Sequence, residues 1–164
     1  MYAVIGEALG NEARKRFFDP ARLYHIGLCV KDIDAAVKFH EDVLGIGPFE
    51  RKEVNFATAT YYGETVGYRG KRAFAQMGDI MLELIGLIDG QTIQADFMEK
   101  RGEGLHHLGF EIDDLKECMA EAQRRGLIIT QSFMREDGSG FAYFNSDTTG
   151  GLIIEVVQKM KPAK

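Results

Sequence analysis

Two histidines and two glutamates in this chain could together hold a divalent metal ion. His25 and His107 each begin a short apolar run with the period of a β-strand, and Glu83 and Glu155 each lie in the middle of such a run. Imidazole nitrogens and carboxylate oxygens suit Mn, Fe, Co, Ni or Zn, and the ligand types alone do not choose among these ions. A single histidine or glutamate in a strand is usually an ordinary core or surface residue, so the prediction depends on how the four residues recur.

The same pattern occurs twice in the sequence. Residues 25–36 read HIGLCVKDIDAA and residues 107–118 read HLGFEIDDLKEC, so an offset of 82 positions (107 minus 25) aligns the two histidines. The run MLELI around Glu83 is matched in the same order by IIEVV around Glu155. Residue type, order and register all recur, which gene duplication explains better than chance. Each half therefore begins with a histidine strand and ends with a glutamate strand.

Strand alternation predicts that the four residues share one face. Successive side chains of a strand point to opposite faces. His25 is thus opposite the apolar face formed by Ile26 and Leu28, Glu83 is flanked by two leucines, and the second half repeats both arrangements. A glutamate flanked by apolar residues in mid-strand is costly to bury without a partner. Two such glutamates, each matched to a histidine, avoid this cost if all four residues bind one cation.

The remaining elements follow from helix and strand signals. A helical pattern follows each histidine strand and ends at Gly45 in the first half and Gly126 in the second, as helices often do. Asp32 and Asp114 are expected N-caps, because a short carboxylate can accept the unpaired N–H groups of the first turn. Further strands are expected near residues 50–56, 72–77, 128–133 and 141–144, with a short helix around residues 92–100.

These elements predict an α+β fold in which two tandem βαβββ modules form a curved mixed sheet around the metal site. The predicted boundaries are an N-terminal extension at residues 1–21 and a single domain at residues 22–164. Within the domain, we expect module one at residues 22–88, a linker helix at residues 89–103 and module two at residues 104–158.

Composition favours a soluble, single-domain protein of the cytoplasm. The chain has 164 residues and a formal net charge of -5, which gives no electrostatic reason to bind nucleic acid or an anionic membrane. No run approaches the roughly 20 apolar residues that span a bilayer, and the first residues do not read as a secretory signal. Cys29 and Cys118 are too far apart for a CxxC motif, so free thiols are expected.

The quoted residues resemble the vicinal-oxygen-chelate superfamily of glyoxalases, bleomycin-resistance proteins and dioxygenases over about residues 22–158. HIGLCVKDI, which begins at His25, is similar to the first metal strand of that family, and GGLIIEVV at residues 150–157 is similar to its last ligand strand. The segment GEGLHHLGFEIDDL at residues 102–115 is the most specific, and it is similar to methylmalonyl-CoA epimerases and their glyoxalase-like relatives.

The resemblance implies the cofactor and the catalytic groups. It implies that His25, Glu83, His107 and Glu155 bind one divalent metal ion (Co, Ni, Zn, Mn or Fe), and that Glu155 or Glu83 leaves the metal to act as the base. The repeat register aligns His107 with His25, so His106 is expected to point toward the convex side. A metal that stabilises an enolate or enediolate, beside a carboxylate that moves a proton, is typical of proton transfer next to a carbonyl.

A methylmalonyl-CoA epimerase-like isomerase is the first expectation for the reaction. Some such epimerases carry a second catalytic glutamate on the strand before the second ligand, but residues 72–77 read RAFAQM and contain no carboxylate. Glu111, expected on the concave face below His107, or Glu64 in the preceding loop would have to replace that glutamate. This difference leaves the epimerase reaction open.

Two alternatives remain. A lactoylglutathione lyase (glyoxalase I)-like lyase is the second expectation, although the chain contains no tryptophan and so lacks the Asn-Trp-Gly motif usual in its bacterial members. A fourth protein ligand, Glu83, argues against an extradiol dioxygenase. A non-catalytic small-molecule (antibiotic) binding protein is the alternative of another class, and the complete ligand quartet favours an enzyme over it.

Substrate contacts are expected from the region before the second ligand. Tyr61, Tyr62 and Tyr68 lie in a Gly- and Thr-rich run that would form a loop over the site, and Arg72 and Phe74 follow it. The partner is expected to be a small molecule, an acyl-CoA among the candidates. Relatives commonly form homodimers, so a homodimer is expected here.

A basic cluster follows the tyrosines. Arg69, Lys71 and Arg72 would suit the phosphates of a CoA tail. A solvated charge run is the preferred interpretation of these residues.

Overall fold

The computed structural model describes residues 17–145 and 150–160, which are mostly β-strand with few helices. No helix in these ranges has the length and apolar character that crossing a membrane requires. The elements, in chain order, are η2 (Pro20–Arg22), β1 (Leu23–Cys29), α2 (Ile33–Phe39), η3 (His40–Leu44), β2 (Glu50–Tyr61), β3 (Glu64–Met77), β4 (Ile80–Gly90), α3 (Ile93–Arg101), β5 (Gly104–Glu111), α4 (Leu115–Arg124), β6 (Ile129–Met134), β7 (Gly140–Phe144) and β8 (Ile153–Gln158).

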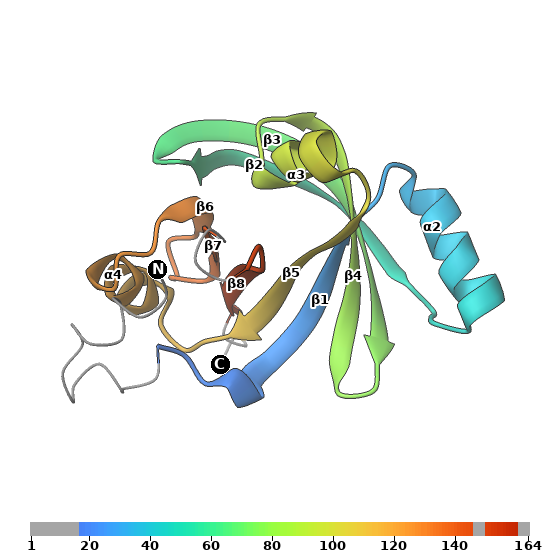
Figure 1. The fold of residues 1–164 in the computed structure, drawn as a ribbon, viewed down its shortest axis with the longest axis horizontal. Coiled ribbons are helices and arrows are strands. Elements are labelled where there is room, and N and C mark those ends of the chain that lie inside the picture. The colour runs from blue at the N-terminus through green and yellow to red at the C-terminus, as the bar shows by residue number, and fades with distance from the viewer. Residues whose placement is uncertain (1–16, 146–149, 161–164) are drawn as a thin grey trace.

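The described strands form one curved, closed sheet in the order β1-β4-β3-β2-β6-β7-β8-β5. The sheet is mixed, because β1–β4 and β5–β8 are parallel pairs and the other neighbours are antiparallel. β1 and β5 lie side by side although they are far apart in the sequence (Figure 1). Closure between β2 and β6 involves two residue pairs, Thr60 with Ser132 and Tyr61 with Gln131, whereas every other neighbouring pair of strands shares five or more.

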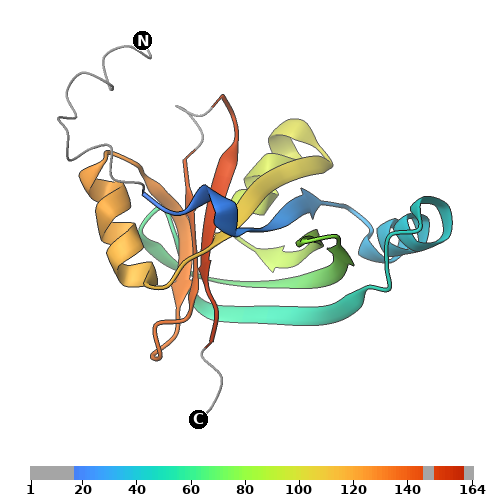
Figure 2. The same cartoon turned by 90° about the horizontal axis from the view of Figure 1, so that it is seen from below.

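Two helices cover separate apolar clusters at opposite ends of the molecule (Figure 2). Ile33 and Val37 of α2 pack with Leu82 and Leu84 of β4. The cluster under α4 contains Leu115, Cys118, Ala122, Ala142, Phe144 and Val156. These clusters hold the apolar faces of the strands outward, so the opposite faces, which carry the predicted ligands, turn toward the interior of the barrel.

The predicted helix caps are confirmed. The Asp32 side chain accepts hydrogen bonds from the backbone N–H groups of Asp34 and Ala35, and Asp114 accepts one from Glu117. The helical run that starts after Asp32 ends at Gly45, whose φ of 68° is the left-handed conformation that glycine adopts without steric cost.

The expected loop at Tyr61, Tyr62 and Tyr68 is wrong, because this region consists of two long strands. β2 extends to Tyr61 and β3 begins at Glu64, so the connection is a two-residue turn in which Tyr62 and Gly63 both have positive φ. Turns of this kind match the twist of paired strands. Thr, Tyr and Val are favoured in strands, and here that preference outweighs the turn signal of the scattered glycines.

Candidate metal centre

Strand register brings the four predicted ligands to one place. They lie on β4, β1, β5 and β8, which are consecutive neighbours in the barrel. Gly27 of β1 is paired with Glu83 on one side and with His107 on the other. Gly109 of β5 is paired with His25 and with Glu155 in the same way. The ligands therefore surround two glycines.

Each histidine ring occupies the space beside the glycine of the other strand. A Cβ atom added at Gly27 would lie 2.1 Å from Cε1 of His107, and one added at Gly109 would lie 2.0 Å from Cε1 of His25. Real Cβ atoms do not approach other atoms so closely. The glycine two positions after each histidine is thus required by the ring that crosses from the opposite strand.

The four side chains form a compact, buried cluster. Nε2 of His25 lies 2.8 Å from Nε2 of His107 and 2.7 Å from Oε2 of Glu155, which is itself 3.1 Å from Nε2 of His107. Oε2 of Glu83 lies 3.3 Å from Nε2 of His25 and 3.5 Å from Nε2 of His107. These ligand atoms all fall within 4.8 Å of one another. No residue of the four is more than 7% exposed.

The donor set fits a divalent cation. Two neutral imidazoles and two carboxylates carry a total charge of −2, which balances such an ion in a buried site. The two imidazole nitrogens that face each other could not both carry a proton without repulsion, so a shared cation is the simplest partner for them. The cluster could therefore hold a metal ion, and its ligand types do not determine which one.

Without an ion, the four groups shift one another's protonation. Burial opposes a charge on the ring of His25, but the carboxylates of Glu155 and Glu83 outweigh this and raise the pKa of His25 to about 10. The pKa of His107 is also raised, against burial, by the same carboxylates. Burial would raise the pKa of both glutamates, but their hydrogen bonds and charge interactions with the two rings lower it.

His106 supports the cluster from outside, a role that the sequence analysis missed. Its Nδ1 lies 2.9 Å from Nδ1 of His107, and its ring packs edge-on against Phe97 of α3 and Tyr143 of β7. Burial and the neighbouring His107 lower the pKa of His106 to about 3, so its ring is neutral. A metal bound at Nε2 of His107 would leave the proton on Nδ1, which would then donate to His106. The sequence feature that could have indicated this role is the position of His106 directly before His107 in the segment GEGLHH.

A cavity of about 190 Å³ opens onto the cluster and is lined by three of the four predicted ligands, His25, Glu83 and Glu155. Of the predicted substrate residues, Tyr68, Arg72 and Phe74 also line it. The remaining aromatic side chains in its wall are Tyr24, Phe56, Phe141 and Tyr143.

Tyr61 and Tyr62 lie elsewhere. The hydroxyl of Tyr61 donates to Oδ2 of Asp96 in α3 over 2.7 Å, and Tyr62 is 56% exposed at the hairpin turn. The corrected secondary structure explains the positions of both tyrosines. They lie at the end of the hairpin, beyond the cavity rather than over it.

The alternative of a basic cluster for CoA phosphates is wrong, because alternation along β3 separates its members. Arg69 pairs with Asp89, Lys71 lies 3.8 Å from Asp34, and only Arg72 turns toward the ligands. Nε of Arg72 lies 3.2 Å from Oε1 of Glu83.

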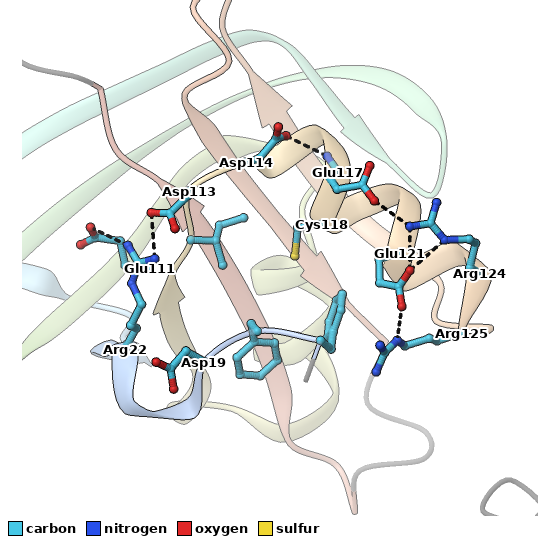
Figure 3. Close-up of a pocket in the computed structure, with 13 residues that line it drawn as sticks. Asp19, Arg22, Glu111, Asp113, Asp114, Glu117, Cys118, Glu121, Arg124 and Arg125 are labelled. Carbon is cyan, nitrogen blue, oxygen red and sulfur yellow. Dashed lines mark hydrogen bonds and ion pairs between the residues drawn. The ribbon is translucent and has the colours of Figure 1, made fainter. Parts of the chain in front are cut away.

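The two glutamates considered as a second acid or base also lie away from the cluster. Glu111 pairs with Arg22 over 3.2 Å and with Lys159 over 2.6 Å. Figure 3 shows it with Arg22 at the edge of a separate cavity beside α4, so its expected position below His107 is wrong. Glu64 is an exposed residue at the start of β3. Within the described part of the chain, neither residue lines the cavity at the cluster.

Replacement of Gly109 by alanine tests the contact between the rings and the glycines. The new Cβ atom would overlap His25, so we expect Gly109→Ala to lower the free energy of unfolding by about 1–3 kcal/mol and to weaken metal binding roughly tenfold. Chemical denaturation and competition with a chromogenic chelator measure the two effects. Gly67→Ala is the matched control, because a Cβ there makes only ordinary contacts. Equal behaviour of the two variants would contradict the interpretation.

Replacement of His106 tests its support of His107. His106→Phe removes the acceptor for Nδ1, so we expect metal affinity to fall roughly 10- to 100-fold. His106→Asn keeps an acceptor oxygen near the same position and should recover part of the loss. Competition titration with a chelator gives the affinities, and wild-type affinity in His106→Phe would rule out the support.

The raised histidine pKa values predict that metal binding depends on pH. With a pKa of about 10 in the metal-free protein, the ring of His25 holds a proton at neutral pH that an ion must displace. Apparent affinity should therefore rise with pH, up to about 10 for His25. Calorimetry at pH 7.5 in buffers of different ionisation enthalpy should show protons released on metal binding, and fewer in His25→Ala. Absence of release in the wild type would contradict this prediction.

Comparison with known proteins agrees with the fold. A family model described as the Glyoxalase/Bleomycin resistance protein/Dioxygenase superfamily matches residues 24–144. The chain is 29% identical over 139 residues to the uncharacterized protein YqjC of Bacillus subtilis (strain 168), covering 84% of this chain and 91% of YqjC. It is 21% identical over 140 residues to the mitochondrial methylmalonyl-CoA epimerase of Mus musculus, covering 84% of this chain and 72% of that protein.

Solved structures show the same fold. The methylmalonyl-CoA epimerase of Mycobacterium tuberculosis superposes with a TM-score of 0.67 at 20% identity, covering 90% of this chain and 92% of that one. A hypothetical protein from Bacillus halodurans C-125, BH1468, superposes with a TM-score of 0.62 at 23% identity, covering 87% and 96%. The predicted family is thus confirmed: the chain belongs to the Glyoxalase/Bleomycin resistance protein/Dioxygenase superfamily.

Proposed function

We propose that the protein is a metal-dependent enzyme that moves a proton on the carbon next to a carbonyl group, in a reaction like that of methylmalonyl-CoA epimerase. The observation that carries this proposal is the buried cluster of two histidines and two glutamates at the end of an aromatic-lined cavity. Structural neighbours that are methylmalonyl-CoA epimerases were solved with methylmalonyl-CoA and with 2-nitronate-propionyl-CoA. These ligands support an acyl-CoA as the first substrate class to test.

The proposed roles follow from the ligand types. His25 and His107 would be neutral donors and Glu83 and Glu155 anionic donors to one divalent ion. Such an ion supplies a Lewis acid that stabilises the oxyanion formed when the proton leaves. The side chains then have two tasks, which are to hold the substrate carbonyl near the cluster and to take and return the proton.

The two carboxylates are not equivalent, and this assigns the base. Oε1 of Glu83 is held by Nε of Arg72, so Glu83 is fixed between Arg72 and the two rings. Glu155 lines the same cavity and pairs with the rings through Oε2. We therefore assign proton abstraction to Glu155. The C–H electron pair would move to the carbonyl oxygen, and the proton would return to carbon from Glu155 or from a second acid.

The second acid decides between two reactions. Among the described residues that line the cavity, the only carboxylates are Glu83 and Glu155. Inversion at carbon would need Glu83, a phenol such as Tyr68 or the ammonium of Lys52 on the opposite face. A lactoylglutathione lyase-like reaction, which moves a proton between adjacent carbons, can use Glu155 alone. This scarcity of carboxylates is the observation that keeps the lyase as the second candidate.

The finer assignments of the architecture are part of the same proposal. Residues 22–88 and 104–158 would be two duplicated βαβββ modules joined by a linker at residues 89–103. The sequence similarity of β1 with β5 and of β4 with β8 supports this duplication. A cytoplasmic homodimer remains the proposed state of the protein.

Metal analysis and deuterium exchange test the function together. We expect one divalent ion per chain, lost in His107→Ala, and entry of solvent deuterium at the α-carbon of methylmalonyl-CoA, followed by mass spectrometry. Glu155→Gln should bind metal but lose exchange by roughly 10²- to 10⁴-fold, because general base catalysis is worth about that much.

The other outcomes separate the alternatives. Bound metal without exchange would contradict the epimerase-like reaction, and the hemithioacetal of methylglyoxal and glutathione would then test the lyase. Unchanged deuterium exchange in Glu155→Gln would mean that another residue acts as the base. Failure to bind any divalent ion would overturn the proposal that the protein is an enzyme, and it would favour a non-catalytic binding protein.

A further inference from the structure

Arg72 is held rigidly beside the ligand cluster. It is 7% exposed, and no other lysine or arginine of the described residues is buried. Its Nε lies 3.2 Å from Oε1 of Glu83, and its Nη1 donates to the backbone carbonyl of Lys71 over 3.1 Å. The guanidinium lies across Gly70, where an added Cβ atom would be 2.7 Å from Nη1. A buried arginine with this much support has a fixed direction.

These contacts leave one end of the guanidinium for a ligand. They use Nε and Nη1, and no hydrogen bond from Nη2 to a described residue is found. Arg72 also lines the cavity at the cluster. A guanidinium edge with unpaired N–H groups in a cavity is suited to bind a carboxylate or a similar oxyanion.

Charge balance in the cavity points to the same ligand. A divalent ion would be neutralised by Glu83 and Glu155, which leaves the positive charge of Arg72 and, nearer the surface, that of Lys52. The rest of the lining is aromatic or aliphatic, and within the described residues it holds no further carboxylate. Although Arg72 contacts Glu83, the cavity with an ion bound would carry an excess of positive charge, and an anionic ligand would balance it.

Dimensions limit the spacing between that anion and the reacting carbonyl. Glu83 touches Arg72 through Oε1 and the histidine pair through Oε2, so a single carboxylate spans the distance between them. A substrate that contacts both must carry its acid group within one or two carbons of the carbonyl. The cavity of about 190 Å³ is also smaller than the roughly 300 Å³ at which drug-sized pockets begin, so it accepts a small head group.

We propose that Arg72 is the specificity-determining residue of the site and that it binds the acid group of the substrate. The substrate is then a small acid, or an acyl compound with a free carboxylate, of the malonate or 2-oxo acid type. The inference rests on the proposed function in one respect, which is that the cluster holds a metal ion. It does not depend on which reaction follows.

Binding of two probes to the Co²⁺-loaded protein tests the proposal without any turnover. Malonate carries the acid group, and imidazole is a neutral ligand that can reach the same ion. Calorimetry gives both affinities, and the visible absorption of Co²⁺ reports independently whether the cluster is loaded and whether each probe reaches it.

Three variants distinguish recognition from support of Glu83. In Arg72→Met we expect malonate affinity to fall roughly tenfold or more, and imidazole affinity to stay within about twofold. Arg72→Lys keeps the charge without the planar fork and should retain part of the malonate affinity. Lys71→Met is the matched control, because it removes a neighbouring charge that pairs with Asp34 outside the cavity, and it should bind malonate like the wild type.

Several results would overturn the proposal. Equal losses for malonate and imidazole in Arg72→Met would mean that Arg72 acts only through Glu83 and the ion. Unchanged malonate binding in that variant, or a loss of the same size in Lys71→Met, would also overturn it. If Arg72→Met does not load Co²⁺, the comparison of Arg72→Lys with the wild type decides in the same way. A loaded wild-type protein that binds malonate but shows no exchange with methylmalonyl-CoA would reject the proposed reaction and keep the role of Arg72.

Discussion

Two imidazole rings cross between neighbouring strands, each lying over the glycine of the other, and the rest of the site depends on this exchange. The antiparallel register of β1 and β5 pairs His25 with Gly109 and Gly27 with His107. Any larger residue at either glycine would collide with a ring. Because the parallel partners β4 and β8 are in register with the same two glycines, the carboxylates reach the rings without distortion of the sheet. Three neighbouring strand pairings thus set all four ligand positions.

Burial gives this arrangement its chemical consequences. The rings and carboxylates are shielded from water, so their mutual interactions dominate the cost of burial and shift the pKa values of the histidines upward and those of the glutamates downward. Contacts outside the cluster make its two halves different. His107 has His106 behind it and Glu83 has Arg72, whereas Nδ1 of His25 is buried and without a hydrogen-bond partner among the described residues. Two sequence segments that match each other thus contribute to an asymmetric site.

Much of the site could be predicted from the sequence because its features repeat locally. Strand alternation and the 82-residue offset, 107 minus 25, were enough to select His107 over His106 and to pair each histidine with a glutamate. The contact of Arg72 with Glu83 could not be predicted, because it depends on a register between β3 and β4 that places Arg72 opposite Ile85, two positions from Glu83. The length of β2 and β3 was missed because glycines at positions 63, 67 and 70 resemble a loop, although only Gly63 lies in a turn.

The short pairing between β2 and β6 has a consequence for how the barrel fluctuates. Two residue pairs join these strands, and the rings of Phe56, Phe133 and Phe141 meet across the same gap with centroids 4.7 Å and 5.4 Å apart. This seam has the shortest strand ladder among the described strands, and the contacts of Thr60 with Ser132 and the backbone hydrogen bond from Tyr62 to Thr130 join it beside the rings, so we expect local opening to begin here. Phe56 and Phe141 also line the cavity. Local opening of the barrel at this seam would widen the cavity from one side. The strands that carry the ligands lie on the opposite wall and would stay paired.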